Sequence, residues 1–109
     1  MDTAPHPDDI VHIATPAEWA AAQAAGRVAP ASLDIEGFVH CSTRAQLPGT
    51  LDRWFRGAGP LRILVLDPGR LDAELRWEES HPGALFPHVY GPLPLDAVVA
   101  VEEIRQAAG

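Results

Sequence analysis

Residues 11–26 of the chain read VHIATPAEWAAAQAAG and place a strand signal directly before a helix signal. The apolar–polar–apolar triplet that opens the segment predicts a short strand, which ends at Thr15. Thr15 and Glu18 have the spacing of a capping box, and Pro16 occupies the first helical position. The alanine-rich run that follows continues the helix until Gly26 ends it. This arrangement is typical of a domain that mixes strands and helices.

Farther along the chain, apolar runs predict more strands and one amphipathic segment predicts a second helix. That helix is expected at residues 43–55, where Thr43 and Gln46 have capping-box spacing. The predicted helix carries one apolar face, formed by Leu47, Leu51, Trp54 and Phe55. Before it, residues 27–36 show no clear period beyond a short turn. The further strands are expected at residues 37–42, 61–66, 75–78, 86–90 and 97–104. The sequence thus predicts a small α+β domain with five or six strands and two main helices.

Length and charge restrict the class of protein. The 109 residues suffice for one domain, expected at residues 10–106 after a flexible tail at residues 1–9. A net charge of −7 argues against nucleic acid or an anionic membrane as a partner held by charge alone. Every basic side chain is an arginine, which excludes Schiff-base chemistry. The lone Cys41 excludes an internal disulfide, and no signal peptide or membrane span is visible, so a cytoplasmic location is expected.

Three predicted strands each carry a histidine. His12 lies between two aliphatic residues and is expected to face away from both. His40 and Ser42 are two residues apart and would share a face of one strand, as would His88 and Tyr90. If these strands are neighbours, their polar faces converge on one cleft.

The same residues also have structural interpretations. A single histidine in a strand is more often a hydrogen-bonded structural residue than a catalyst, whereas three with one pattern favour a site. Their spacing lacks the short-spaced pair of most zinc sites, so no metal is predicted. Cys41 adjoins His40, but neighbours on a strand point to opposite faces, which disfavours a Cys–His nucleophile. Glu78 either forms an exposed ion pair with Arg76 or offers a carboxylate to a ribose hydroxyl or as a base.

Four segments resemble the motifs of the DUF952 family, which carries a domain of unknown function. The resemblance runs in order through most of the chain, from about residue 10 to residue 104. The segments are VHIA at residues 11–14, GFVHCS at 37–42, LRWE at 75–78 and FPHVYGPL at 86–93.

The resemblance implies a distant relationship to the ADP-ribosyltransferase superfamily, which includes RNA 2′-phosphotransferases that use NAD. It implies a mostly antiparallel split sheet and a cleft for an NAD- or ADP-ribose-type ligand. In that superfamily a first-strand histidine or arginine contacts the nicotinamide-side ribose, an aromatic residue, histidine or serine follows on a second strand, and a later strand supplies a polar residue that is usually glutamate.

By motif, His12 takes the first of these positions, and His40 with Ser42 takes the second. His88 falls near the third position, where it departs from the usual glutamate, so Glu78 is the carboxylate that would replace it. The resulting candidate catalytic residues are His12, His40, Glu78 and His88. The candidate ligand-binding residues are Ser42, Thr43, Arg44, Arg53, Trp77 and Tyr90, in which the arginines and the helix start at Thr43 would meet phosphate.

Three functions remain open from the sequence. The first is an ADP-ribosyltransferase-like protein that takes NAD as a substrate, and the second is a binding module that holds a nucleotide-like metabolite without turning it over. The third is a partner-binding protein in which the histidines are structural.

Overall fold

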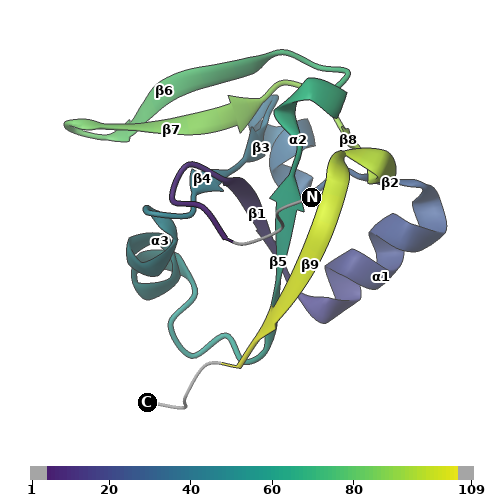
Figure 1. Ribbon diagram of the computed structural model, residues 1–109, viewed down its shortest axis with the longest axis horizontal. Coiled ribbons are helices and arrows are strands. Elements are labelled where there is room, and N and C mark those ends of the chain that lie inside the picture. The colour runs from purple at the N-terminus through teal and green to yellow at the C-terminus, as the bar shows by residue number, and fades with distance from the viewer. Residues whose placement is uncertain (1–4, 106–109) are drawn as a thin grey trace.

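The chain forms two main antiparallel sheets, a larger one that runs through the middle of the molecule and a smaller one at the top of the view (Figure 1). The computed structural model describes residues 5–105. The larger sheet has the order β4-β1-β5-β9, and the smaller has the order β3-β7-β6. The larger sheet consists of β1 (Ile10–Ala14), β4 (Ser42–Thr43), β5 (Leu61–Leu66) and β9 (Val98–Ile104). The smaller sheet consists of β3 (Val39–His40), β6 (Leu75–His81) and β7 (Ala84–Val89). A two-stranded ribbon adds β2 (Arg27–Val28) and β8 (Leu93–Pro94).

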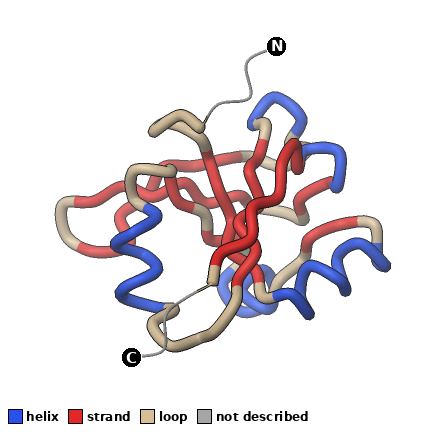
Figure 2. Tube along the Cα trace, turned by 60° about the horizontal axis from the view of Figure 1, so that its bottom comes forward, coloured by secondary structure: helices blue, strands red, loops and turns tan. Residues whose placement is uncertain are grey.

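The helices lie at the periphery, and the strands cross the middle of the molecule (Figure 2). The helices are α1 (Pro16–Ala25), α2 (Ala31–Glu36) and α3 (Leu47–Trp54), with the short 3-10 helices η1 (Pro68–Arg70) and η2 (Leu95–Ala97). No helix within residues 5–105 has the length and apolar character needed to span a membrane.

Helix α1 confirms the capping pattern read from the sequence. The Thr15 hydroxyl accepts a hydrogen bond from the Glu18 amide at 3.0 Å, and the Glu18 carboxylate accepts one from the Thr15 amide at 2.8 Å. Gly26 ends the helix with φ of 84°, a left-handed conformation that a residue without Cβ adopts at little cost. These local bonds account for both ends of the helix.

Strand β5 forms the centre of the larger sheet and is buried on both faces. It pairs with β1 on one side and with β9 on the other. Ile63 faces one apolar cluster with Val11, whereas Leu64 faces a larger cluster on the opposite side of the sheet. His12 pairs with Leu64, so its side chain lies on the side of the larger cluster. One polar side chain of β1 is thereby held among apolar neighbours.

The structure corrects the prediction of one strand at residues 37–42. Val39 and His40 pair with β7, whereas Ser42 and Thr43 pair with β1 in the other sheet. Between them the Cys41 amide donates to the carbonyl of Pro87 at 3.1 Å as the chain crosses from one sheet to the other. His40 and Ser42 therefore do not share one strand.

The structure also corrects the predicted helices. Within residues 27–36, where the sequence shows no clear period, the chain forms β2 and α2. Because α2 has no buried residue, its sequence lacks the repeated apolar positions by which a helix is predicted. The second predicted helix begins at Leu47 rather than at residue 43. Thr43 and Gln46 do exchange side-chain-to-amide hydrogen bonds, at 3.0 and 3.1 Å, but these close a turn before the helix.

The count of elements is higher than predicted. Within residues 5–105 the fold contains nine strands in three sheets and three α-helices, and every strand pair is antiparallel. The α+β class and the antiparallel pairing are confirmed. The additional strands span two residues each, too few to show a period of two. Of the predicted tail, residues 1–4 lie outside the described residues. In the described part, the carbonyls of Pro7 and Asp9 accept hydrogen bonds from the amides of Ala45 and Arg44.

Candidate functional site

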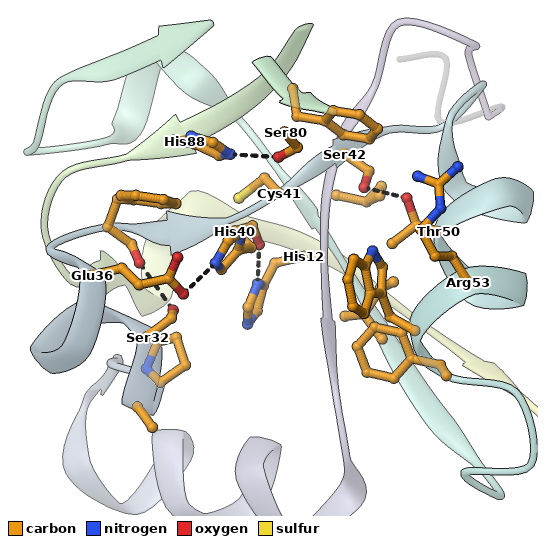
Figure 3. Close-up of a pocket in the computed structure, with 18 of the residues that line it drawn as sticks. His12, Ser32, Glu36, His40, Cys41, Ser42, Thr50, Arg53, Ser80 and His88 are labelled. Atoms are coloured by element: carbon orange, nitrogen blue, oxygen red, sulfur yellow. Dashed lines mark hydrogen bonds and ion pairs between the residues drawn. The ribbon is translucent and has the colours of Figure 1, made fainter. Parts of the chain in front are cut away.

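The three strand histidines meet at one cavity of about 710 Å³. His12 comes from β1, His40 from β3 and His88 from β7, so both sheets contribute to its wall. Figure 3 shows Ser32, Glu36 and His40 on one side, Arg53 on the opposite side, and His12 between them. A volume of this size lies within the range of small-molecule sites in proteins.

His12 is a buried imidazole with one nitrogen in use. Its side chain is only 7% exposed, and its Nδ1 lies 2.7 Å from the carbonyl oxygen of His40. A carbonyl only accepts, so Nδ1 carries the proton and Nε2 is the acceptor of this tautomer. Burial lowers the pKa of His12, while the hydrogen bond to His40 opposes that shift. Among the described residues nothing bonds to Nε2, which leaves an acceptor on a cavity-lining ring.

His88 is fixed by a chain of hydrogen bonds across the β6–β7 hairpin. Its Nδ1 lies 2.8 Å from Glu78 Oε1, and its Nε2 lies 3.3 Å from the hydroxyl oxygen of Ser80. The hydroxyl of Tyr90 donates to the same Glu78 oxygen at 2.6 Å. The bond from Tyr90 is the largest cause that lowers the pKa of Glu78, followed by the bond from His88. The ionised carboxylate thus orients the ring as in other relays that pair a carboxylate with a histidine.

Of the three histidines, His40 is the most exposed. Its Nε2 lies 2.8 Å from Glu36 Oε1, and both side chains are close to half exposed. Phe38 packs against both neighbouring histidines, edge-on to His40 with centroids 4.8 Å apart and stacked on His88 at 4.1 Å. The aromatic ring therefore fixes the spacing of two imidazoles, whose own centroids lie 5.3 Å apart.

Helix α3 provides the opposite wall. Ser42 and Thr50 exchange a hydrogen bond between hydroxyls at 3.1 Å, which ties the helix to β4. Arg53, Trp54 and Phe55 follow at the end of the helix and also line the cavity. Trp54 is 73% exposed, contrary to its expected place on a buried helix face, because it reaches the cavity and its rim instead of the core.

The structure brings together five of the ten predicted site residues at the cavity. These are His12, His40, Ser42, Arg53 and His88. Glu78 is hydrogen-bonded to His88, and Tyr90 is hydrogen-bonded to Glu78, but neither is among the lining residues. The lining also does not include Thr43, Arg44 or Trp77.

Arg44 has a different set of partners from the phosphate that the sequence suggested. Two of its nitrogens donate to the two carboxylate oxygens of Glu102 at 2.9 and 2.8 Å, and a third donates to Asp9 at 3.2 Å. The bidentate bond to Glu102 is the largest cause that raises the pKa of Arg44. Here the guanidinium joins β9, β4 and the start of β1.

Several cavity residues were not predicted. Glu36 and Phe38 flank the glycine that ends α2, a helix the sequence did not reveal. Ser80 lies near the turn of the hairpin, where the register shifts between β6 and β7. The spacing of Glu78 and Ser80, two residues apart on a strand, was the available signal that both would face His88.

Two kinds of chemistry have little support at this site. Within residues 5–105, no three side chains of histidine, cysteine, aspartate or glutamate meet as a metal-binding group. Burial raises the pKa of the Cys41 thiol to about 12, so it is not a thiolate at neutral pH. The cavity instead offers imidazoles, hydroxyls, carboxylates, one guanidinium and aromatic rings.

Comparisons with known proteins agree with the fold and give no activity. No curated protein matches the sequence. The crystal structure of protein CC0527 from Caulobacter crescentus, a structural genomics target, is 38% identical, with a TM-score of 0.83 over 92% of this chain and 89% of that chain. The solution structure of CC0527 is 37% identical, with a TM-score of 0.79 over 93% and 88% of the two chains. The family model described as protein of unknown function (DUF952) matches residues 13–101, and the chain belongs to that family.

Proposed function

We propose that the cavity binds a nucleotide-type ligand of the NAD or ADP-ribose class, in the manner of an ADP-ribosyltransferase-like protein. The observation that carries the proposal is the arrival of His12, His40 and His88 from three separate strands at one cavity. Ribose hydroxyls both donate and accept hydrogen bonds, and imidazoles at several angles suit such a ligand. The resemblance to the superfamily points to the same ligand class.

Two of the histidines, His12 and His88, have distinct parts in the proposed site. His12 offers Nε2 as an acceptor for a hydroxyl, since its Nδ1 proton is held by the His40 carbonyl. His88 is the ring held most rigidly, by Glu78 on one nitrogen and Ser80 on the other. In this proposal Glu78 and Tyr90 are positioning residues that act through His88.

We propose glycosyl transfer from NAD to a hydroxyl group or to water as the reaction class: nicotinamide leaves with the electron pair of the broken bond, the ribose carbon bonds to the acceptor oxygen, and the proton of the acceptor passes to solvent. Breakage of the nicotinamide–ribose bond develops positive charge on the ribose, which a nearby carboxylate stabilises. Glu36 is a cavity-lining carboxylate beside His40, whereas the Glu78 carboxylate is turned toward Tyr90 and His88. Release of nicotinamide should therefore fall more in Glu36→Gln than in Glu78→Gln.

The position of Glu78 also favours a second function, binding without turnover. Glu78 was the carboxylate expected to do chemistry, and it is not among the lining residues. If the protein binds NAD without turnover, NAD stabilises the folded protein, but no nicotinamide is released by the wild type or by either glutamine variant.

The test is a thermal titration of the purified protein with NAD, ADP-ribose, nicotinamide and zinc. A ligand at 100 times its Kd stabilises the folded state by about 2.7 kcal/mol. We expect a rise in Tm with NAD or ADP-ribose that is lost in His12→Asn and retained in His6→Ala, a change at an exposed histidine outside the cavity lining. An unchanged Tm at millimolar concentrations of every nucleotide would overturn the proposal.

A further inference from the structure

The cavity has imidazoles and an exposed tryptophan on different walls. Strands β1, β3 and β7 contribute the three histidines, with the unused Nε2 of the buried His12. The end of α3 contributes the aromatic side chains of Trp54 and Phe55. Trp54 is 73% exposed, so its ring is accessible on this wall. An exposed tryptophan on a cavity wall is a platform for a planar ring, because aromatic faces stack with little loss of side-chain freedom.

The charge of the cavity is predominantly negative. Its lining includes the three carboxylates of Glu18, Glu36 and Glu79, against the single guanidinium of Arg53 among the same residues. His12 adds no charge near neutral pH, since burial lowers its pKa. The whole chain has a net charge of −7, which extends the negative potential beyond the cavity. Such a potential favours a ligand whose ring is positively charged.

From these observations we infer that the cavity selects a nucleoside whose planar ring bears a positive charge, with Trp54 as the platform for the ring and His12 Nε2 as the acceptor for a ribose hydroxyl. The inference rests on the proposed function for the location of the site and narrows its ligand class. The tryptophan face carries the negative end of the ring quadrupole and attracts a cation. The carboxylates of Glu18, Glu36 and Glu79, which line the cavity from α1, α2 and β6, add a longer-range attraction from the facing walls.

Two pairs of ligands isolate the charge of the ring. NAD in its oxidised form has a cationic pyridinium ring, and NADH differs by the hydride that makes this ring neutral. Nicotinamide riboside and its dihydro form repeat the comparison without any phosphate. By isothermal titration calorimetry we expect the oxidised member of each pair to bind about threefold to tenfold more tightly, the range of a cation–π contact.

Substitutions assign the selectivity to residues. Trp54→Leu keeps an apolar side chain but removes the aromatic face, and should lower the affinity ratio of each pair to the part that the carboxylates supply. Ile35→Ala truncates an apolar side chain that is 80% exposed and absent from the lining, and should leave the ratio unchanged. Trp77→Leu tests the other exposed tryptophan, and loss of the ratio there rather than in Trp54→Leu would overturn the assignment.

The ribose contact has its own comparison. 1-Methylnicotinamide, which is methylated on the ring nitrogen, carries the same cationic ring without ribose, so the wild type should bind nicotinamide riboside more tightly than it binds 1-methylnicotinamide. His12→Asn should remove that difference while leaving the binding of 1-methylnicotinamide intact. Circular dichroism establishes that the variant is folded, and the wild-type comparison stands without it.

The outcomes separate this inference from the proposed function. Equal affinity for NAD and NADH would overturn the inference and leave nucleotide binding in place. Binding of nicotinamide riboside but not of NAD would support the inference and overturn the proposed dinucleotide ligand. Failure of all four ligands and of ADP-ribose to bind would overturn both.

Discussion

The central strand β5 and the hairpin β6–β7 both belong to antiparallel sheets, yet burial contributes to them unequally. In β5, Leu61, Ile63 and Leu64 are fully buried, and their stabilisation comes from removing apolar surface from water. The hairpin is fully buried at Pro87 and Val89, at the end of β7, but it exposes Trp77 by 48% and Leu85 by 53%. Next to the cavity, a set of hydrogen bonds at His88 adds a directional constraint.

The difference shows how stability and function are divided in this small domain. Burial is insensitive to angle, so β5 stabilises the fold without placing any side chain to a fraction of an ångström. A hydrogen bond weakens steeply with angle, so the bonds between Glu78, His88 and Tyr90 determine where one ring lies. Substitutions in β5 should therefore affect unfolding, and substitutions in the hairpin should affect the site.

The largest effect should come from Leu64→Ala. Leu64 is fully buried in the larger apolar cluster, and its truncation leaves a cavity in the core. We expect a loss of about 3 kcal/mol in the free energy of unfolding, measured in urea. Leu85→Ala in the hairpin is the control and should change it by less than about 0.5 kcal/mol. Equal losses would show that the hairpin is as tightly packed as β5.

His88→Ala should have a smaller effect on stability and a larger one on the site. It removes a buried ring, the stack on Phe38 and the bonds to Glu78 and Ser80. We expect a loss of about 2 kcal/mol in the free energy of unfolding and loss of the Tm rise with NAD. The control His6→Ala, a change at an exposed histidine, should keep the wild-type free energy of unfolding and the Tm rise with NAD. A variant that still responds to NAD like the wild type would remove His88 from the site.

The parts of the fold that follow from short-range patterns were predictable. The helix at α1 has both of its capping signals in the sequence, and β5 is apolar at every position except Arg62 because both its faces are buried. The crossing at Cys41 was not predictable, because alternation continues through it while the hydrogen-bond partners change from one sheet to the other. Trp54 fits an amphipathic helix pattern, and its exposure depends on where α3 lies against the sheets.

The candidate site was predictable to a similar degree. Strand alternation pointed to His12, His40 and His88, because a polar residue within an apolar run is conspicuous. The partners of these histidines were not predictable. Glu36, the partner of His40, ends a helix that the sequence did not reveal, and the turn that brings the two side chains together is defined by the tertiary structure. Charge likewise suggested Arg44 as a phosphate ligand, and the ion pairs with Glu102 and Asp9 depend on distant segments.

The buried His12 also permits a test by pH. The folded-state pKa of His12 is lowered by burial, so as pH falls through its ordinary value of about 6.5 the unfolded state takes up a proton before the folded state. The free energy of unfolding should therefore decrease as pH falls from 7.5, until the lower folded pKa is reached. His12→Asn keeps a donor toward the His40 carbonyl but does not titrate, and its urea midpoint should depend less on pH.

The matched control for this pH series is His6→Asn, which changes an exposed histidine and should keep the wild-type slope. If His12→Asn and the wild type lose stability in parallel between pH 7.5 and 5.5, His12 is not the buried neutral acceptor that the site requires.

The smallest effect concerns the carboxylate behind His88. Tyr90 is the only tyrosine of the chain, so the phenolate absorbance in a pH titration reports its pKa directly. Its hydrogen bond to Glu78 is the main cause that raises the pKa of Tyr90, since the neighbouring carboxylate opposes loss of the phenolic proton. Glu78→Gln should therefore lower the pKa of Tyr90 toward its ordinary value, whereas Glu79→Gln should leave it unchanged. Identical titrations in all three proteins would mean that Tyr90 and Glu78 do not share a hydrogen bond in solution, and Glu78 would then hold His88 without support from Tyr90.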